Sequence, residues 1–154
     1  MNAVTPMLCG LALVVALPAM AAKGTEPMST LEVTRCTVEY AVNPLGLDER
    51  RPRLGWVLQS DGKSQKQTAY QVLVASTRER LAKHSGDVWD SGRVASSESV
   101  HVEYAGPPLA STMRYYWKAR VWDAHGHGSE WSEPAWFEMG LLEPSDWGAQ
   151  WLGA

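Results

Sequence analysis

The chain has 154 residues, of which 45% are hydrophobic, a composition that is ordinary for a globular protein with a single core. Lysine and arginine total 14 against 17 aspartate and glutamate residues, which gives a net charge of −3. Because the charge provides no basic stripe, it disfavours a nucleic acid or an anionic membrane as a partner.

The first 22 residues carry no charged side chain and have the pattern of a secretory signal. An apolar segment from Met7 to Leu17 precedes Pro18 and the small-residue sequence Ala19-Met20-Ala21, so we expect a signal peptide at residues 1–21. The segment is too short to span a bilayer, and we expect an exported protein, periplasmic or extracellular, without a membrane partner after cleavage. A buried strand or helix is the alternative interpretation.

The chain has two cysteines, of which Cys9 lies inside the expected signal peptide. Cys36 is then the only cysteine of the mature chain, so an intramolecular disulfide is not expected despite an oxidising destination. A catalytic cysteine would need a histidine partner, and no histidine lies near Cys36 in the sequence. We therefore favour the interpretation of Cys36 as a small buried hydrophobic residue on a strand.

After a flexible polar leader at residues 22–30, the sequence consists of short strand-like runs separated by Gly, Pro, Asn and Asp. One short helix is expected from Arg78 to Lys83, with Ser76 or Thr77 as its cap and Leu81 as its anchor. The expected strands cover residues 31–40, 54–59, 69–75, 89–94, 99–104, 115–122 and 131–139. About seven short antiparallel strands without crossover helices predict an all-β sandwich over residues 31–140.

The stretch from Leu109 to Gly140 contains the clearest strand. Tyr115, Trp117, Ala119 and Val121 recur at a spacing of two, which predicts that these side chains face the core. The alternate residues Tyr116, Lys118, Arg120 and Trp122 are then expected on the outer face. Trp56 also falls on the inward face of its strand, so we expect both Trp56 and Trp117 in the core.

This stretch resembles the end of a fibronectin type III domain, an immunoglobulin-like β-sandwich. Leu109 precedes Tyr115 by six residues, and a Gly-bearing turn and a serine follow the alternating strand. The resemblance implies a tyrosine corner, in which the hydroxyl of Tyr115 bonds back to the backbone a few residues upstream.

A narrower resemblance covers nearly all of residues 31–154 and is to the N-terminal region of bacterial α-L-rhamnosidases. The blocks that carry it are Asn43-Pro44-Leu45-Gly46-Leu47-Asp48, Pro52-Arg53-Leu54-Gly55-Trp56, Gln67-Thr68-Ala69-Tyr70-Gln71-Val72, Trp89-Asp90-Ser91-Gly92-Arg93-Val94, Tyr115-Tyr116-Trp117-Lys118, Val121-Trp122-Asp123, Ser129-Glu130-Trp131-Ser132 and Trp147-Gly148-Ala149-Gln150-Trp151-Leu152-Gly153-Ala154. The sequence of residues 141–154 is typical of a linker followed by the truncated start of another domain, and the resemblance implies that this entry begins at Trp147. It also implies that the catalytic carboxylates lie in a downstream α/α-barrel, so no catalytic residue is expected in this chain.

The acidic and histidine side chains offer few candidates for acid–base catalysis or metal binding. The carboxylates lie in or beside turns, where they commonly bond to local backbone, and we favour that role over acid–base catalysis. They are Asp48, Glu49, Asp87, Asp90 and Asp123. His125 and His127 could bind a metal only with a third ligand, so an exposed turn is favoured, and we expect neither a metal nor another cofactor.

Three tryptophans on outward faces, Trp122, Trp131 and Trp136, are the candidate carbohydrate-binding residues, because aromatic rings stack on sugar faces. The alternative is a structural ladder in which Lys118 and Arg120 stack on these rings, and the Gly-Ser-Glu-Trp-Ser sequence resembles the Trp-Ser motif of cytokine-receptor fibronectin domains. Such cation–π contacts are worth about 0.5 to 2 kcal/mol each. The ladder is the favoured interpretation.

Three hypotheses for function follow. The first is a non-catalytic accessory module of a secreted α-L-rhamnosidase, packed against the downstream domains of the parent enzyme. The second is a carbohydrate-binding module with a rhamnose-containing polysaccharide as partner, and the third is a fibronectin-type protein-interaction domain.

Overall fold

A computed structural model describes residues 29–62 and 64–148. The expected signal peptide at residues 1–21, most of the leader and the end of the expected following segment, residues 149–154, lie outside the described residues. No helix within the described ranges is long and apolar enough to cross a membrane.

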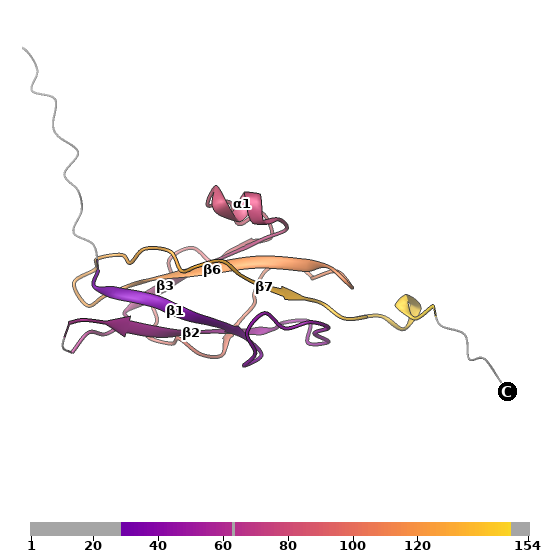
Figure 1. Ribbon diagram of the computed structural model, residues 1–154, viewed down its shortest axis with the longest axis horizontal. Coiled ribbons are helices and arrows are strands. Elements are labelled where there is room, and N and C mark those ends of the chain that lie inside the picture. Colours follow the sequence, from indigo (N-terminus) through magenta and orange to yellow (C-terminus); the bar gives the residue numbers. More distant parts are fainter. Residues whose placement is uncertain (1–28, 63, 149–154) are drawn as a thin grey trace, which may run out of the picture.

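The described residues form an immunoglobulin-like β-sandwich of seven strands, which confirms the predicted fold class. One sheet has the order β1-β2-β5 and the other has the order β4-β3-β6-β7, with antiparallel pairing throughout both. The strands are β1 (Leu31–Val38), β2 (Arg53–Ser60), β3 (Ala69–Ala75), β4 (Trp89–Asp90), β5 (Val102–Glu103), β6 (Arg114–Trp122) and β7 (Ala135–Glu138). Figure 1 shows the two layers, with the helix α1 (Arg78–Ala82) outside the β3-β6 layer.

Several strands are shorter than the sequence predicts, for backbone reasons. β1 ends at Val38 because Glu39 and Tyr40 take positive φ values of 47° and 65°, which turn the chain. After β4, the Asp90 carboxylate accepts a hydrogen bond from the N–H of Gly92, whose φ is 60°. β7 begins only at Ala135, after Pro134, which has no N–H to give to a ladder.

The core lies between the two sheets, as alternation along the strands requires. Trp117, Phe137, Val72 and Leu54 are fully buried, and Trp56 is 2% exposed. The indole N–H of Trp56 donates to the side chain of Gln67, 3.1 Å away, which satisfies its polar atom. Burying a large apolar side chain is worth about 1.5–3 kcal/mol, so this cluster supplies the main stabilisation.

A second, smaller cluster lies on the outer face of the β3-β6 layer. The Thr77 hydroxyl caps α1 by accepting from the N–H of Arg80, and Leu81 is fully buried. Leu81 packs with Leu73 and Ala75 rather than entering the core between the sheets. The helix therefore covers part of the outer face, next to the residues that alternation predicts to be exposed.

Candidate functional site

The outer face of β6 carries a ladder of cations and tryptophan rings. The guanidinium carbon of Arg120 lies 4.8 Å from the ring centroid of Trp122 and 4.6 Å from that of Trp131. Arg93 lies over the Trp122 ring at 4.7 Å, and Lys118 Nζ lies 5.1 Å from the Trp131 centroid. Trp122 and Trp131 are thus each contacted by two cations.

The cations of the ladder are held by hydrogen bonds. Arg120 donates from Nε and Nη2 to Gln71 Oε1 at 3.0 and 2.8 Å. Lys118 Nζ donates to the carbonyl of Leu81 at 2.7 Å and lies 3.0 Å from His84 Nδ1. Burial lowers the pKa of Lys118 and of Arg120, because both charges are partly removed from water.

Two serines fix the loop that presents Trp131. The hydroxyl oxygen of Ser129 accepts from the N–H of Val121 at 3.0 Å, and that of Ser132 accepts from the N–H of Ala119 at 3.1 Å. Both hydroxyls then donate to the carbonyl of the residue that follows them. The two serine hydroxyls therefore take the place of backbone carbonyls as hydrogen-bond acceptors beside β6. This fastening places the Trp131 ring against Arg120.

Trp136 lies apart from this ladder, on β7. The guanidinium carbon of Arg114 is 4.1 Å from its ring centroid, and the same guanidinium pairs with Glu138 at 2.9 Å. All three candidate sugar-binding tryptophans are therefore half-buried and carry a cation over the ring. This arrangement favours the structural role, because a ring face covered by a guanidinium is not free to stack on a sugar.

Tyr115 and Tyr104 tie loops to the core. The Tyr115 hydroxyl oxygen accepts from the N–H of Ala110 at 2.9 Å, the contact that a tyrosine corner requires. The Tyr104 hydroxyl donates to the carbonyl of Pro107 at 2.7 Å, and burial raises the pKa of Tyr104 to about 12. A Cβ on Gly106 would lie 2.4 Å from that hydroxyl, so glycine is required there.

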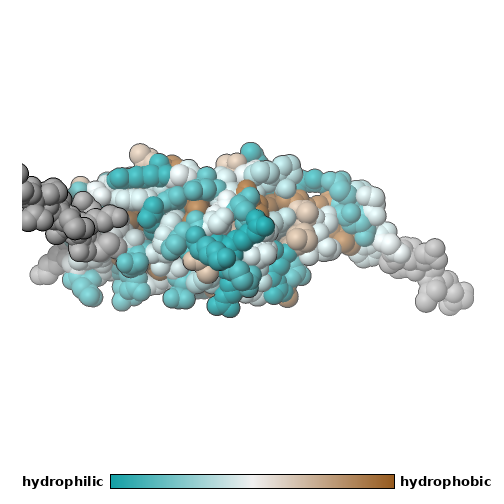
Figure 2. Space-filling model, turned by 90° about the horizontal axis from the view of Figure 1, so that it is seen from above, coloured by the Kyte–Doolittle hydropathy of each residue, from teal (hydrophilic) through white to brown (hydrophobic). Residues whose placement is uncertain are grey.

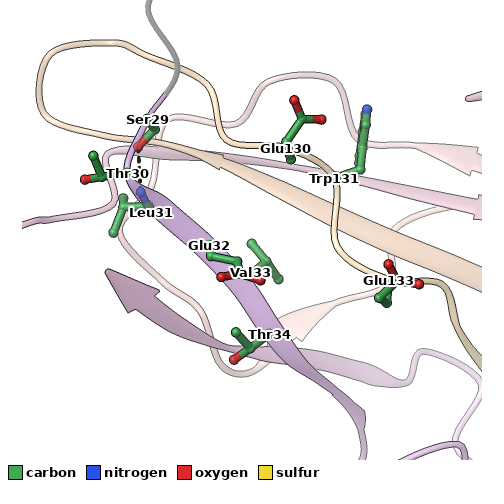
Figure 3. Close-up of a pocket in the computed structure, with 9 residues that line it drawn as sticks. All are labelled: Ser29, Thr30, Leu31, Glu32, Val33, Thr34, Glu130, Trp131 and Glu133. Carbon is green, nitrogen blue, oxygen red and sulfur yellow. Dashed lines mark hydrogen bonds between the residues drawn. The ribbon is translucent and has the colours of Figure 1, made fainter. Parts of the chain in front are cut away.

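A hollow of about 450 Å³ lies beside the ladder, between the start of β1 and the loop of Trp131 (Figure 3). Its lining includes Glu32, Glu130 and Glu133, together with Thr34 and Trp131. These three carboxylates make the hollow negatively charged.

Other carboxylates serve turns. Asp87 accepts from both the N–H and the hydroxyl of Ser76, and Glu49 accepts from the N–H of Arg51. Burial by itself raises the pKa of Asp123, but the N–H groups of His127 and His125 that it accepts outweigh burial and hold the pKa below its usual value. The rings of His125 and His127 stack 5.9 Å apart. Within residues 29–62 and 64–148, no three metal-ligating side chains are gathered.

The chain leaves the sandwich through a segment that is bound rather than loose. Arg50 donates to the carbonyl of Leu142 at 2.6 Å and pairs with Glu143 at 2.7 Å. Ser111 donates to the carboxylate of Asp146, which also accepts from the N–H of Glu143 at 2.9 Å. Up to Trp147, the segment expected to be a linker is thus fastened to two loops of the sandwich. Sequence reasoning missed Arg50, Ser111 and Asp146, because their partners are distant in the chain.

Known proteins resemble this chain over most of its length. A family model described as "Rha78A-like, N-terminal immunoglobulin domain" matches residues 33–143. An α-L-rhamnosidase of Streptomyces avermitilis is 53% identical over 127 residues, which are 82% of this chain and 12% of that protein. An α-L-rhamnosidase of Formosa agariphila is 39% identical over 125 residues, 80% of this chain and 13% of that protein.

The fold agrees with these matches. The crystal structure of Streptomyces avermitilis α-L-rhamnosidase complexed with L-rhamnose matches with a TM-score of 0.76 at 53% identity, over 80% of this chain and 12% of that one. The structure of α-L-rhamnosidase from Dictyoglumus thermophilum matches with a TM-score of 0.74 at 41% identity, over 76% of this chain and 13% of that one. The chain spans 12% to 13% of the length of these relatives.

Proposed function

Since the chain belongs to the family of Rha78A-like, N-terminal immunoglobulin domains, we propose that it is the accessory β-sandwich of an exported α-L-rhamnosidase. In this role it takes no direct part in hydrolysis, and it packs against and positions the domains that follow. The family membership confirms the resemblance found in the sequence.

The observation that carries the proposal is the 53% identity to a stretch that makes up 12% of an α-L-rhamnosidase. An inverting glycosidase needs a general acid and a base about 6.5–9.5 Å apart across the sugar ring. Asp123 and Glu49 of this chain instead accept hydrogen bonds from the N–H groups of their own turns, and Asp87 accepts from Ser76, on the other side of α1. These contacts support a structural role for the carboxylates.

A chimera tests the proposal. Residues 29–148 replace the matching stretch of the Streptomyces avermitilis enzyme, and release of rhamnose from an aryl α-L-rhamnoside is measured for the chimera and for the isolated chain. We expect kcat/KM of the chimera to lie within about tenfold of that of the parent enzyme, and no turnover by the isolated chain. Hydrolysis by the isolated chain, or a folded chimera without activity, would contradict the proposal.

Export is a part of the proposal that has its own test. The uncharged apolar segment and the Ala19-Met20-Ala21 sequence support cleavage after Ala21. Expression of the full chain in a Gram-negative host should give a periplasmic protein whose first residue is Ala22 by mass spectrometry. A cytoplasmic product with an intact N-terminal segment would contradict this part.

Carbohydrate binding is the second candidate, and one observation favours it. The hollow beside Trp131 is lined by three carboxylates, Glu32, Glu130 and Glu133, and carboxylates accept hydrogen bonds from sugar hydroxyls. Affinity electrophoresis in a gel containing a rhamnose-bearing polysaccharide tests it. Retardation of the isolated chain that disappears in the double variant Glu130→Gln, Glu133→Gln would support it, and unretarded migration of the unaltered chain would contradict it.

A further inference from the structure

Exposed apolar side chains occur on the segments that adjoin one another where the chain leaves the sandwich and on the segment that follows. Leu45 is 65% exposed, Met113 45%, Leu141 42% and Trp147 64%. These four residues, here called the exit surface, come from three separate segments of the sequence. Single exposed apolar residues are ordinary on a protein surface, but several of them on adjoining segments are typical of an interaction site.

Backbone hydrogen bonds bring these segments side by side. Gly140 donates to the carbonyl of Leu47 at 2.7 Å and accepts from the N–H of Thr112 at 3.0 Å. Met139 donates to the carbonyl of Met113 at 2.9 Å, and Glu138 donates to that of Pro44 at 3.0 Å. The loop of Leu45 and the loop of Met113 therefore flank the strand that leads to Leu141. Figure 2 shows hydrophobic atoms on the molecular surface near the end from which the C-terminal trace departs.

The exit surface is held in one arrangement with respect to the sandwich. Arg50 and Ser111 bind the segment from Leu142 to Asp146, whose last three residues form the turn η1 (Pro144–Asp146). The hydrogen bond from Ser111, together with the N–H of Glu143, holds the pKa of Asp146 below its usual value. Figure 1 shows that the described chain begins at one end of the sandwich and leaves at the other.

We propose that the exit surface is the docking face for the domain that follows this module, and that the Arg50 and Ser111 contacts fix the direction in which the chain enters it. This inference rests on the proposed function, because the occupant is the next domain of the same polypeptide. The family model describes an N-terminal domain, and the relatives are about eight times longer than the stretch they share with this chain.

Because the following domain is covalently linked to this module, the four apolar residues of the exit surface are enough to hold it docked. A tethered partner is present at an effective concentration in the millimolar range, so a small apolar contact holds it without a large interface. The Arg50–Glu143 ion pair at 2.7 Å and the Arg114–Glu138 pair at 2.9 Å add a polar rim to the apolar residues. A following domain with an apolar patch near its first residues is the complementary surface.

The experiment uses the chimera described above and the isolated chain. The double variant Leu45→Asp, Leu141→Asp places two charges in the exit surface, and the matched control is Val57→Asp, Val100→Asp. The control residues are similarly exposed, at 51% and 57%, and neither belongs to the exit segments. Limited proteolysis measures how fast the module is released from the chimera, and urea denaturation of the isolated chain shows whether each variant is folded.

We expect the exit variant to be released about tenfold faster than the unaltered chimera, since an undocked linker is open to the protease. The control variant should be released at the unaltered rate. Equal release rates for the exit variant and the control, with both folded as isolated chains, would overturn the inference. If either double variant unfolds, the single change Trp147→Ala is compared with the unaltered chimera under the same criterion.

The outcomes separate this inference from the proposed function. A chimera that is active but insensitive to changes in the exit surface overturns only the docking face. A folded chimera without rhamnoside hydrolysis overturns the proposed function, whatever the proteolysis shows.

Discussion

Two regions of this molecule are rich in aromatic and apolar side chains, and they differ in what covers them. On the outer face of β6, Arg120 stacks on both Trp122 and Trp131, at 4.8 and 4.6 Å. At the exit surface, Trp147 remains 64% exposed and Leu45 65%. A count of tryptophans does not separate the two, but the groups that lie over the rings do.

The difference teaches how to assign a role to a surface tryptophan. A ring covered by cations that are themselves hydrogen-bonded, as Arg120 is to Gln71, contributes to the stability of the module. An exposed ring on a fastened segment contributes little until a partner covers it. The ladder is thus interpreted as internal structure, and the exit surface as an interface.

The largest expected effect is the contrast between Trp131→Ala and Trp147→Ala in the isolated chain. Trp131 contacts Arg120, Lys118 and the His84 ring, so its truncation should lower the free energy of unfolding by about 2–3 kcal/mol. Truncation of Trp147 should cost less than about 0.5 kcal/mol. Urea denaturation measures both, and equal costs would break the comparison.

A smaller effect concerns the loop that carries Ser111 and Met113. Tyr115→Phe removes the hydroxyl that accepts from Ala110, which should cost about 1 kcal/mol. Tyr116→Phe is the matched control, because it removes a hydroxyl from the neighbouring residue on the opposite face of β6. An unchanged denaturation midpoint for Tyr115→Phe would show that the corner does not hold this loop.

The smallest expected effect is a change in pH dependence. The pKa of Asp123 and that of Asp146 both lie below their usual values in the folded chain. Their stabilising contribution is therefore fully present above the unfolded pKa of about 4 and is lost as the pH falls through the lower folded value. Asp123→Asn should flatten this acid-side loss, because the amide oxygen still accepts from His125 and His127 but does not titrate.

Stability measured by urea denaturation between pH 2 and about pH 7 would check this expectation. Asp146→Asn should flatten the curve less, since Asp146 lies on the surface at the exit. A stability curve for Asp123→Asn that runs parallel to that of the unaltered chain would contradict the claim that titration of Asp123 contributes to the loss of stability at acid pH.

Much of the fold could be predicted from the sequence, because the alternation in β6 is strict. Tyr115, Trp117, Ala119 and Val121 are all buried between the sheets. The same alternation places Lys118 on the outer face, yet Lys118 is only 5% exposed. Alternation assigns a face but does not reveal what covers it, and here the end of α1 covers Lys118 through the carbonyl of Leu81.

The exit contacts could not be predicted in this way. Arg50 and Leu142 are 92 positions apart, and Ser111 and Asp146 are 35 apart, so no local pattern pairs them. Hydrophobic alternation also did not predict where β1 ends. The strand ends because Glu39 and Tyr40 take positive φ values, and no glycine marks these positions in the sequence. Side-chain contacts between loops depend on the assembled sandwich, and hydrophobic periodicity carries no information about them.

Amide hydrogen exchange of the isolated chain and of the chimera tests the docking face most directly. Peptides that cover residues 41–48 and 139–148 should exchange at least about tenfold more slowly in the chimera, while those that cover residues 97–101 should exchange at the same rate in both proteins. Equal exchange in the two exit peptides would contradict the claim that the exit surface is covered by the domain that follows.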